Sequence, residues 1–415
     1  MFETLFQYPT VLARHREGPA ADERQRFLSH RAQEGAARGT LLRIARELLV
    51  IAKSINLTTG KAIDRHDLDV AAVKWARQQQ HRRRSHGARW SRELFVQVGT
   101  SWLRFIGRLQ ESEPTPSPFT DLIKNFAHHM RDERGLSEVT IRARCWHAEK
   151  LLAWLMSQDR CLTEVSLRDV DAFLSEKGGR DWGRVSVATC AKALRAFFRH
   201  AAMRGWCAGD IAAGIDGPRL FAQEGLPTGP VWSDVQQLIT STKGDRPGDI
   251  RDRAILMLFA TYGFRSAEVA RLRLEQVNWE REIIAIMRPK QRRAQEYPLV
   301  HSVGEAIIRY LRQVRPRGSH REIFLTLSAP FRPLSQGALY NLVSKRFCAL
   351  QTDSRHRGPH SLRHACAGHL VAERFSLKAV GDHLGHRSAS ATRTYAKVDL
   401  AGLREVGNFD LGGLL

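Results

Sequence analysis

The chain has 415 residues, with 65 Lys or Arg against 43 Asp or Glu, so its formal net charge is +22. The composition, 43% hydrophobic and 26% charged, excludes wholesale disorder, and the length predicts about two to four domains of roughly 100–200 residues. Because a folded chain with this excess of positive charge repels itself, we expect a polyanionic partner. Nucleic acid is the usual one, and an anionic membrane surface is the alternative.

The sequence carries no sign of a membrane span or of secretion. No stretch approaches the roughly 18 uninterrupted apolar residues of a membrane-spanning helix, and the N-terminus lacks a basic region followed by an apolar core. The cysteines are too widely spaced for a zinc ribbon or a disulfide scaffold, which predicts a reduced, cytoplasmic compartment. They are Cys145, Cys161, Cys190, Cys207, Cys348 and Cys366.

The first region, residues 1–113, is predicted to be helical, with apolar periodicity over 41–52 and 94–109. Residues 70–110 contain nine Lys or Arg and a single acid. The centre of this basic stretch is either a solvated face or an arm that follows phosphates, and the net charge favours the arm. Its candidate DNA contacts are Arg82, Arg83 and Arg84. Alternating prolines at 113–118 predict a linker.

The second region, residues 117–210, is predicted to be a small helical domain. Ser137 is a candidate N-cap for one helix, and apolar residues repeat at helical spacing again over 185–203. The basic residues between these apolar positions are candidate DNA contacts: Arg142, Arg144 and Arg195. Repeated Gly and Pro over 211–230 predict a second linker.

The third region, residues 231–400, is predicted to mix helices with a small sheet. Two short strands, 283–287 and 296–300, flank a basic hairpin. Helices are expected at 250–260, 266–274, 303–314, 335–350, 359–374, 377–384 and 389–395, followed by a tail at 401–415. The fold class expected for the chain is mainly α with a small β-sheet.

The densest polar cluster lies in the predicted helix 359–374. His360 and His364 are four residues apart, on one face, as in the zinc site of a protease helix. A metal is disfavoured because Ser361 stands where that motif has its Glu and because Arg363 would repel a cation. As an anion site the cluster is consistent, since His360 and Arg363 can reach the same oxyanion and Arg265 begins another helix.

The order and spacing of six residues resemble the tyrosine recombinase family, the lambda-integrase and Xer-type enzymes. The most specific stretch runs from Leu384-Gly-His386 through a Thr to Tyr395. The resemblance covers about residues 117–400, and the N-terminal 113 residues are similar to extensions of transposon-borne members. The six residues are Arg265, Lys290, His360, Arg363, His386 and Tyr395.

The resemblance implies the chemistry of these residues. Arg265 and Arg363 would neutralise a phosphodiester, and Tyr395 would attack it to form a 3′-phosphotyrosine. A phenol has an ordinary pKa near 10, so a neighbouring base, for which His360 is the candidate, and the surrounding cations are expected to assist. Lys290 would be the general acid.

The remaining site residues have supporting roles in this reading. His386 would donate to a phosphate oxygen, Glu268 would orient its neighbours, and His364 would support the site from outside the core set. Arg292 and Arg293 in the hairpin are further candidate DNA contacts.

The resemblance also implies the partners. These are double-stranded recombination sites bound by a homotetramer, which could include sibling recombinases, in the bacterial cytoplasm and at the nucleoid when bound. No metal, ATP or other cofactor is expected. The tail 401–415 is a contact between protomers or a frayed terminus.

Two rival functions remain open. A type IB topoisomerase shares the covalent chemistry, but the separate helical domain favours a recombinase. A non-catalytic DNA-binding protein of the same fold is disfavoured by the complete polar set from Arg265 to Tyr395.

Overall fold

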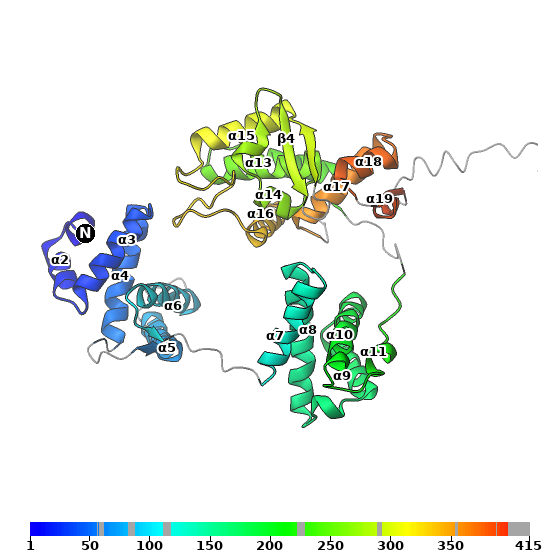
Figure 1. The fold of residues 1–415 in the computed structure, drawn as a ribbon. Coiled ribbons are helices and arrows are strands. Elements are labelled where there is room, and N and C mark those ends of the chain that lie inside the picture. The colour runs from blue at the N-terminus through cyan, green and yellow to red at the C-terminus, as the bar shows by residue number, and fades with distance from the viewer. Residues whose placement is uncertain are drawn as a thin grey trace, which may run out of the picture. The chain divides into compact units, whose positions relative to one another are not determined.

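The computed structural model divides the chain into two compact units. One unit comprises Met1–Gln110 together with Gly225–Leu415, and the other comprises Glu111–Glu224. Both are built mainly from helices (Figure 1), which confirms the expected fold class. Among the residues described, none of the helices combines the length and apolar character that crossing a membrane demands. The structure describes residues 1–55, 57, 62–81, 88–110, 118–221, 229–288, 293–352, 356–386 and 388–396.

The N-terminal part has its own hydrophobic core, to which Leu48 of α4 and Trp102 of α6 contribute fully buried side chains. Helix α6 ends at Phe105, before the predicted limit of 109, because Gly107 adopts a left-handed φ of +68°. Leu109 then pairs with Ile63 in a short parallel bridge. The elements are α1 Phe2–Leu5, α2 Pro9–Arg16, α3 Ala21–Gln33, α4 Arg38–Ser54, β1 Ile63–Asp64, α5 Arg65–His81, α6 Ala88–Phe105 and β2 Leu109–Gln110.

The second unit is a small helical domain around a core that includes Phe173, Phe197 and Phe198. Its longest helices begin where local signals predict. The Ser137 hydroxyl accepts a hydrogen bond from the Thr140 amide at 3.4 Å, which confirms the predicted N-cap. The elements are α7 Thr120–His128, the π-helical η1 His129–Glu133, α8 Glu138–Ser157, the 3-10 turn η2 Leu162–Glu164, α9 Leu167–Arg180, α10 Arg184–Met203 and α11 Ile211–Gly214.

The C-terminal part combines helices with a three-stranded antiparallel sheet in the order β3-β4-β5. The predicted hairpin is confirmed, with Ile286 paired to Gln295 and Arg288 paired to Arg293. The elements are α12 Trp232–Thr240, α13 Pro247–Tyr262, α14 Ser266–Ala270, η3 Leu274–Gln276, β3 Val277–Asn278, β4 Ile283–Arg288, β5 Arg293–Pro298, α15 His301–Gln313, α16 Gln336–Ala349, α17 Pro359–Ala372, α18 Leu377–Leu384 and α19 Ala389–Ala396.

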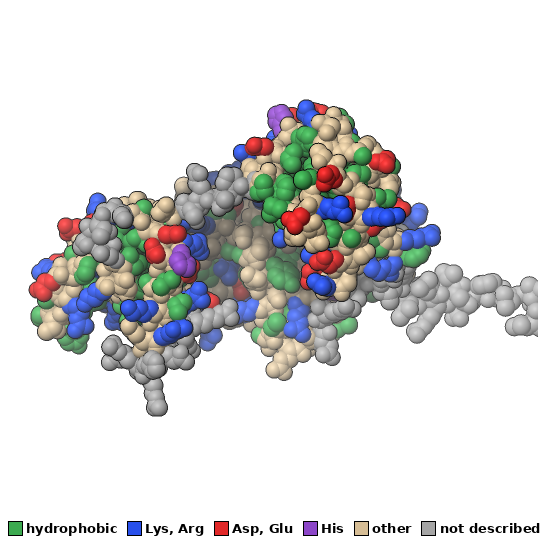
Figure 2. All heavy atoms as spheres, turned by 90° about the horizontal axis from the view of Figure 1, so that it is seen from below, with side chains coloured by type: hydrophobic (Ala, Val, Ile, Leu, Met, Phe, Trp, Pro, Cys, Tyr) green, Lys and Arg blue, Asp and Glu red, His purple; other side chains and the backbone are tan. Residues whose placement is uncertain are grey.

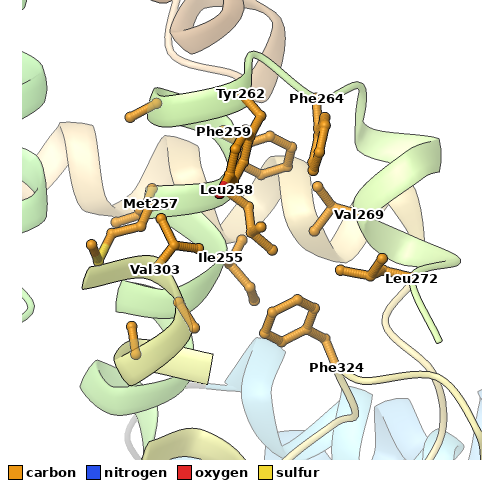
Figure 3. Close-up of a cluster of buried hydrophobic side chains, with 14 of the residues drawn as sticks. Ile255, Met257, Leu258, Phe259, Tyr262, Phe264, Val269, Leu272, Val303 and Phe324 are labelled. Carbon is orange, nitrogen blue, oxygen red and sulfur yellow. The ribbon is translucent and has the colours of Figure 1, made fainter. Parts of the chain in front are cut away.

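Helix α13 is the centre of this part. Its side chains are buried almost all round, which is typical of a helix enclosed by others. Figure 3 shows Ile255, Leu258 and Phe259 of α13 pointing toward Val269 and Phe324 from other elements. Because α13 is enclosed, the loop that follows its end at Tyr262 is held in a defined place.

Two predicted elements have different bounds in the structure. Helix α14 stops at Ala270, because the backbone after it pairs with a distant segment: the Ile323 amide donates to the Leu272 carbonyl at 2.8 Å. Strand β5 covers Arg293–Pro298 and not 296–300, because the backbone of Arg293 already pairs with Arg288 of β4. Both differences result from backbone hydrogen bonds between segments, which the local apolar periodicity of the sequence cannot predict.

Candidate active site

Helix α17 brings three of the predicted site residues onto neighbouring turns. It begins with Pro359 at its first position, after Gly358 as N-cap. His360 is exposed in the first turn, Arg363 is buried, and His364 lies beside His360 with ring centroids 4.5 Å apart. The predicted spacing therefore places the three side chains at the same end of one helix.

Arg363 is held rigidly by two backbone carbonyls. Nη1 donates to the Gly263 carbonyl at 2.5 Å and Nη2 to the Leu384 carbonyl at 2.7 Å. Burial, and then the charge of Arg265, lowers the pKa of Arg363 to about 10. The side chain thus stays protonated at neutral pH while it joins the loop after α13 to the end of α18.

Arg265 occupies the N-cap of α14 and is anchored by Glu268. The Glu268 carboxylate accepts from the Arg265 amide at 2.8 Å and from its Nη1 at 2.9 Å. Glu268 is buried, whereas the Arg265 side chain remains 45% exposed. Glu268 thus contacts the Arg265 guanidinium while that guanidinium remains accessible; the orienting role of Glu268 stays a prediction.

His386 follows a tight turn at the end of α18. Gly385 has a φ of +61°, a left-handed conformation that glycine adopts without strain. Nδ1 of His386 lies 2.7 Å from the Thr392 hydroxyl of α19. Burial lowers the pKa of His386 to about 4, with smaller contributions from Arg363, Arg265 and Arg288. His386 is therefore a neutral imidazole at neutral pH.

Tyr395 is buried between α17, α18 and α19, with 2% of its surface exposed. Its hydroxyl lies 2.9 Å from Nδ1 of His364, and its ring is nearly parallel to that of His386, with centroids 6.3 Å apart. Burial, and then His360 and Arg363, lowers the pKa of His364 to about 4. The phenol thus faces a neutral imidazole that can accept its proton.

Two expectations about Tyr395 can be compared with this geometry. The surrounding cations were expected to favour the phenolate, but burial raises the pKa of Tyr395 and Arg363 offsets this only in part. His360 was expected to be the base, yet the imidazole in contact with the hydroxyl belongs to His364. Partial removal from solvent, and then the charges of Arg363 and Arg265, also lower the pKa of His360.

Comparison with known proteins identifies the family. Residues 232–401 match the Phage integrase family, and residues 123–205 match the Phage integrase, N-terminal SAM-like domain. A Sinorhizobium fredii protein that carries the name integrase/recombinase is 33% identical over 297 residues, 71% of this chain and 72% of the relative. The chain belongs to the phage integrase family of tyrosine recombinases. It is a tyrosine-type site-specific recombinase, a DNA strand transferase.

Further relatives and solved structures of tyrosine recombinases are similar to this chain. Tyrosine recombinase XerC of Thermodesulfovibrio yellowstonii is 27% identical over 291 residues, 68% of this chain and 94% of the relative. XerH recombinase bound to its difH substrate superposes with a TM-score of 0.54 at 18% identity, covering 83% of this chain and 96% of XerH. A lambda integrase dimer bound to a core site gives a TM-score of 0.53 at 15% identity, covering 66% and 94%. At these identities the two structures support the fold alone.

Several predicted residues of the recombinase fall outside the described part of the chain. Lys290, the candidate general acid, is one of them, as is the side chain of Arg293. The same holds for Arg292 and for the basic run Arg82, Arg83 and Arg84. Their roles stay predictions.

The candidate DNA contacts of the helical unit differ in their exposure and in their interactions within the unit. Arg142 is exposed on α8 and Arg144 is half-buried. Arg195 is engaged inside the unit, because its Nε donates to the Ile215 carbonyl at 2.7 Å and its Nη2 lies 3.9 Å from Asp216. Figure 2 shows Lys and Arg side chains spread over the face in view and interspersed with acids.

Sequence reasoning missed two site residues, Arg288 and Thr392. Thr392 lies in the stretch that carries the family resemblance, but its bond to His386 becomes visible only when α18 and α19 pack together. Arg288 lies on the same face of β4 as Ile284 and Ile286, and all three side chains are buried. A charged residue at an inward position of a strand is the signal that could have found it.

Proposed function

We propose that this recombinase cleaves and rejoins DNA strands through a 3′-phosphotyrosine formed on Tyr395. One observation carries the proposal: the Tyr395 hydroxyl is 2.9 Å from Nδ1 of a neutral His364. The two site arginines act electrostatically on the same site. The charge of Arg265 lowers the pKa of Arg363, and the charges of both arginines lower the pKa of His386. A phenol with a proton acceptor beside it, in cationic surroundings, suits attack on an anionic phosphodiester.

The arginines would neutralise the phosphate. Negative charge on the non-bridging oxygens repels a nucleophile, and it must be stabilised as the in-line transition state forms. Arg265 and Arg363 would donate to these oxygens, and removal of one such donor typically costs about 10²–10³ in rate. His386 would donate through Nε2, because Thr392 already engages Nδ1.

The cleavage step conserves atoms and charge. The Tyr395 oxygen bonds to phosphorus, its proton passes to an imidazole, and the bond from phosphorus to the 5′ oxygen breaks. We assign the imidazole to His364 on the strength of its contact with the hydroxyl, and we assign His360 to the phosphate. Lys290 would protonate the departing 5′ oxygen. Because Tyr395 is buried, the segment around α19 must open before the step can occur.

Resealing reverses the same step. The free 5′ hydroxyl of a second strand attacks the phosphotyrosine, and the tyrosine regains its proton. One ester replaces another at each step, so neither ATP nor metal is needed. Two such exchanges, through a Holliday junction, would recombine two duplexes, with double-stranded recombination sites as substrates and a homotetramer, or a mixed tetramer with sibling recombinases, as the active assembly.

Each region of the chain would have a separate function in this reaction. We assign residues 117–210 to binding of the core DNA site and residues 231–400 to catalysis, joined by the linker 211–230. The family match over residues 123–205 lies within the first of these ranges, and the match over 232–401 coincides with the second to within one residue at each end. Residues 1–113 would contact DNA or a partner, and the tail 401–415 would contact a neighbouring protomer.

Covalent trapping tests the mechanism. Nicked duplexes of randomised sequence lose a short 5′-hydroxyl fragment after cleavage, so that a phosphotyrosine intermediate cannot be resealed. We expect the wild-type recombinase to yield protein–DNA complexes that survive SDS, and Tyr395→Phe to yield none while binding DNA with unchanged affinity. Tyr262→Phe, which removes another buried phenol of the catalytic part, controls for loss of a tyrosine. Trapping by Tyr395→Phe at the wild-type level would exclude Tyr395 as the nucleophile.

A plasmid assay with the wild-type recombinase distinguishes strand exchange from DNA relaxation. Family membership favours exchange. A supercoiled plasmid that lacks the duplex sequences trapped in the covalent complexes should stay supercoiled, whereas relaxation without any sequence requirement would support the topoisomerase alternative.

A further inference from the structure

Arg288 is a buried cation that the chemistry proposed above does not use. It is the last residue of β4 and has 2% of its surface exposed. Nη1 donates to the Leu384 carbonyl at 2.7 Å, and Nη2 donates to the Tyr297 hydroxyl at 2.5 Å. Its Nε lies 3.7 Å from a carboxylate oxygen of Glu268. One guanidinium thus touches a strand, a helix end and the carboxylate that anchors Arg265.

The Leu384 carbonyl is shared between two guanidinium groups. Nη1 of Arg288 and Nη2 of Arg363 both donate to it, each at 2.7 Å. The neighbouring carbonyl of His383 accepts from the Tyr297 hydroxyl at 2.6 Å. Two consecutive carbonyls at the end of α18 are therefore fixed by side chains of the sheet and of α17, immediately before the turn that places His386.

The turn is shaped around Arg288. A Cβ atom on Gly385 would lie 1.1 Å from Nη1 of Arg288, so the backbone approaches the guanidinium more closely than any other residue would allow. Gly385 is left-handed as well. Glycine is thus required here both for its φ and for the space that Arg288 occupies, which ties the position of His386 to that of Arg288.

The Arg288 guanidinium also faces Glu268, the carboxylate that anchors Arg265. Glu268 accepts from Nη1 of Arg265 at 2.9 Å with the same carboxylate oxygen, Oε1, that faces Nε of Arg288. Both Glu268 and Arg288 are buried, and a buried charge without a partner is costly. Arg288 therefore compensates the buried carboxylate while Arg265 remains accessible.

We propose that Arg288 is a positioning residue that holds the His386 turn and the Arg265–Glu268 pair in fixed relation to Arg363. It acts through these groups and not through the substrate, because it is buried beneath them. The inference rests on the proposed function. Arg288 also precedes Lys290 by two residues, so it anchors the strand end from which the hairpin with the candidate general acid departs.

The test compares Arg288→Met, which removes the charge and the donors, with Arg288→Lys, which keeps the charge. The substrate is the nicked duplex that wild type traps. At saturating DNA we expect Arg288→Met to lower the rate of covalent complex formation about 10²-fold, the typical cost of a 1 Å displacement in a catalytic site, and to leave the DNA dissociation constant unchanged. Arg288→Lys should recover part of the rate.

Tyr297→Phe covers the case in which Arg288→Met fails to fold. It removes one contact of Arg288 and one of the His383 carbonyl, and we expect it to slow cleavage. Tyr262→Phe is the matched control: its hydroxyl is also buried and hydrogen-bonded, but to the Pro298 carbonyl and the Val300 amide. Equal rates for the two variants, or a wild-type rate for Arg288→Met, would overturn the proposal.

A measurement without turnover separates this inference from the mechanism. Arg363, Arg265, Arg288 and His364 are the charged or titratable groups that depress the pKa of His386. In an NMR titration of the imidazoles, the His386 midpoint should rise in Arg288→Met and stay at its wild-type value in Tyr262→Phe. If wild type traps no DNA, the proposed function fails and this titration still tests Arg288. An unchanged His386 midpoint in folded Arg288→Met would refute the positioning role.

Discussion

Replacement of His364 decides which imidazole accepts the Tyr395 proton. His364→Asn retains a polar atom near the position of Nδ1, which touches the hydroxyl at 2.9 Å, but it cannot take up a proton. A positioned general base typically contributes about 10²–10⁴ in rate. We therefore expect single-turnover cleavage by His364→Asn to slow by about that factor, with unchanged affinity for DNA.

The pH dependence of the wild-type rate follows from the depressed pKa. His364 is active when neutral, so its activity is present above its pKa of about 4 and is lost as the pH falls through that value. At about pH 5 such a base is still roughly 90% neutral, whereas an imidazole with the ordinary pKa of about 6.5 is roughly 3% neutral. The rate corrected for folded protein should thus change little between about pH 8 and 5, instead of falling about thirtyfold.

The assay is covalent trapping on the nicked duplex, with circular dichroism to measure the folded fraction at each pH. His383→Asn is the matched control, because His383 is a partly buried imidazole of the same unit whose Nε2 lies 3.0 Å from the Thr261 carbonyl. It should cleave near the wild-type rate. A wild-type rate for His364→Asn together with a large loss for His360→Asn would refute the assignment, and so would a rate midpoint near the ordinary pKa of histidine.

Two further predictions concern stability. His364 and His386 have pKa values lowered to about 4 in the folded chain. Between about pH 6.5 and 4 the unfolded chain therefore binds more protons than the folded chain, and the midpoint of thermal unfolding should fall as the pH is lowered. A thermal midpoint that rises on acidification would contradict these pKa shifts. Phe198 is fully buried in the helical unit, so Phe198→Ala should cost about 3–5 kcal/mol in urea unfolding, whereas Met203→Ala, at an exposed site of the same helix, should stay within about 0.5 kcal/mol of wild type. Equal costs for these two variants would show that the core assignment is wrong.

The sequence by itself determined the features that depend on neighbouring residues. Helices with strong apolar periodicity were predicted to within a few residues, and α18 was predicted at its observed limits, Leu377–Leu384. The N-cap at Ser137 follows from its own side chain. The order and spacing of the six site residues, which pointed to the family, are also properties of the linear chain. These predictions succeeded because the interactions involved span one helical turn or one hairpin.

The tertiary structure decided what depends on residues far apart in the chain. The Arg288 guanidinium and the Leu384 carbonyl are 96 residues apart in sequence, and His364 and Tyr395 are 31 apart. No local pattern encodes that the first pair meets, or that His364 and not His360 touches the phenol. The directions of the pKa shifts have the same origin, because burial is the largest cause for His364, His386 and Tyr395, and burial exists only once the helices have packed.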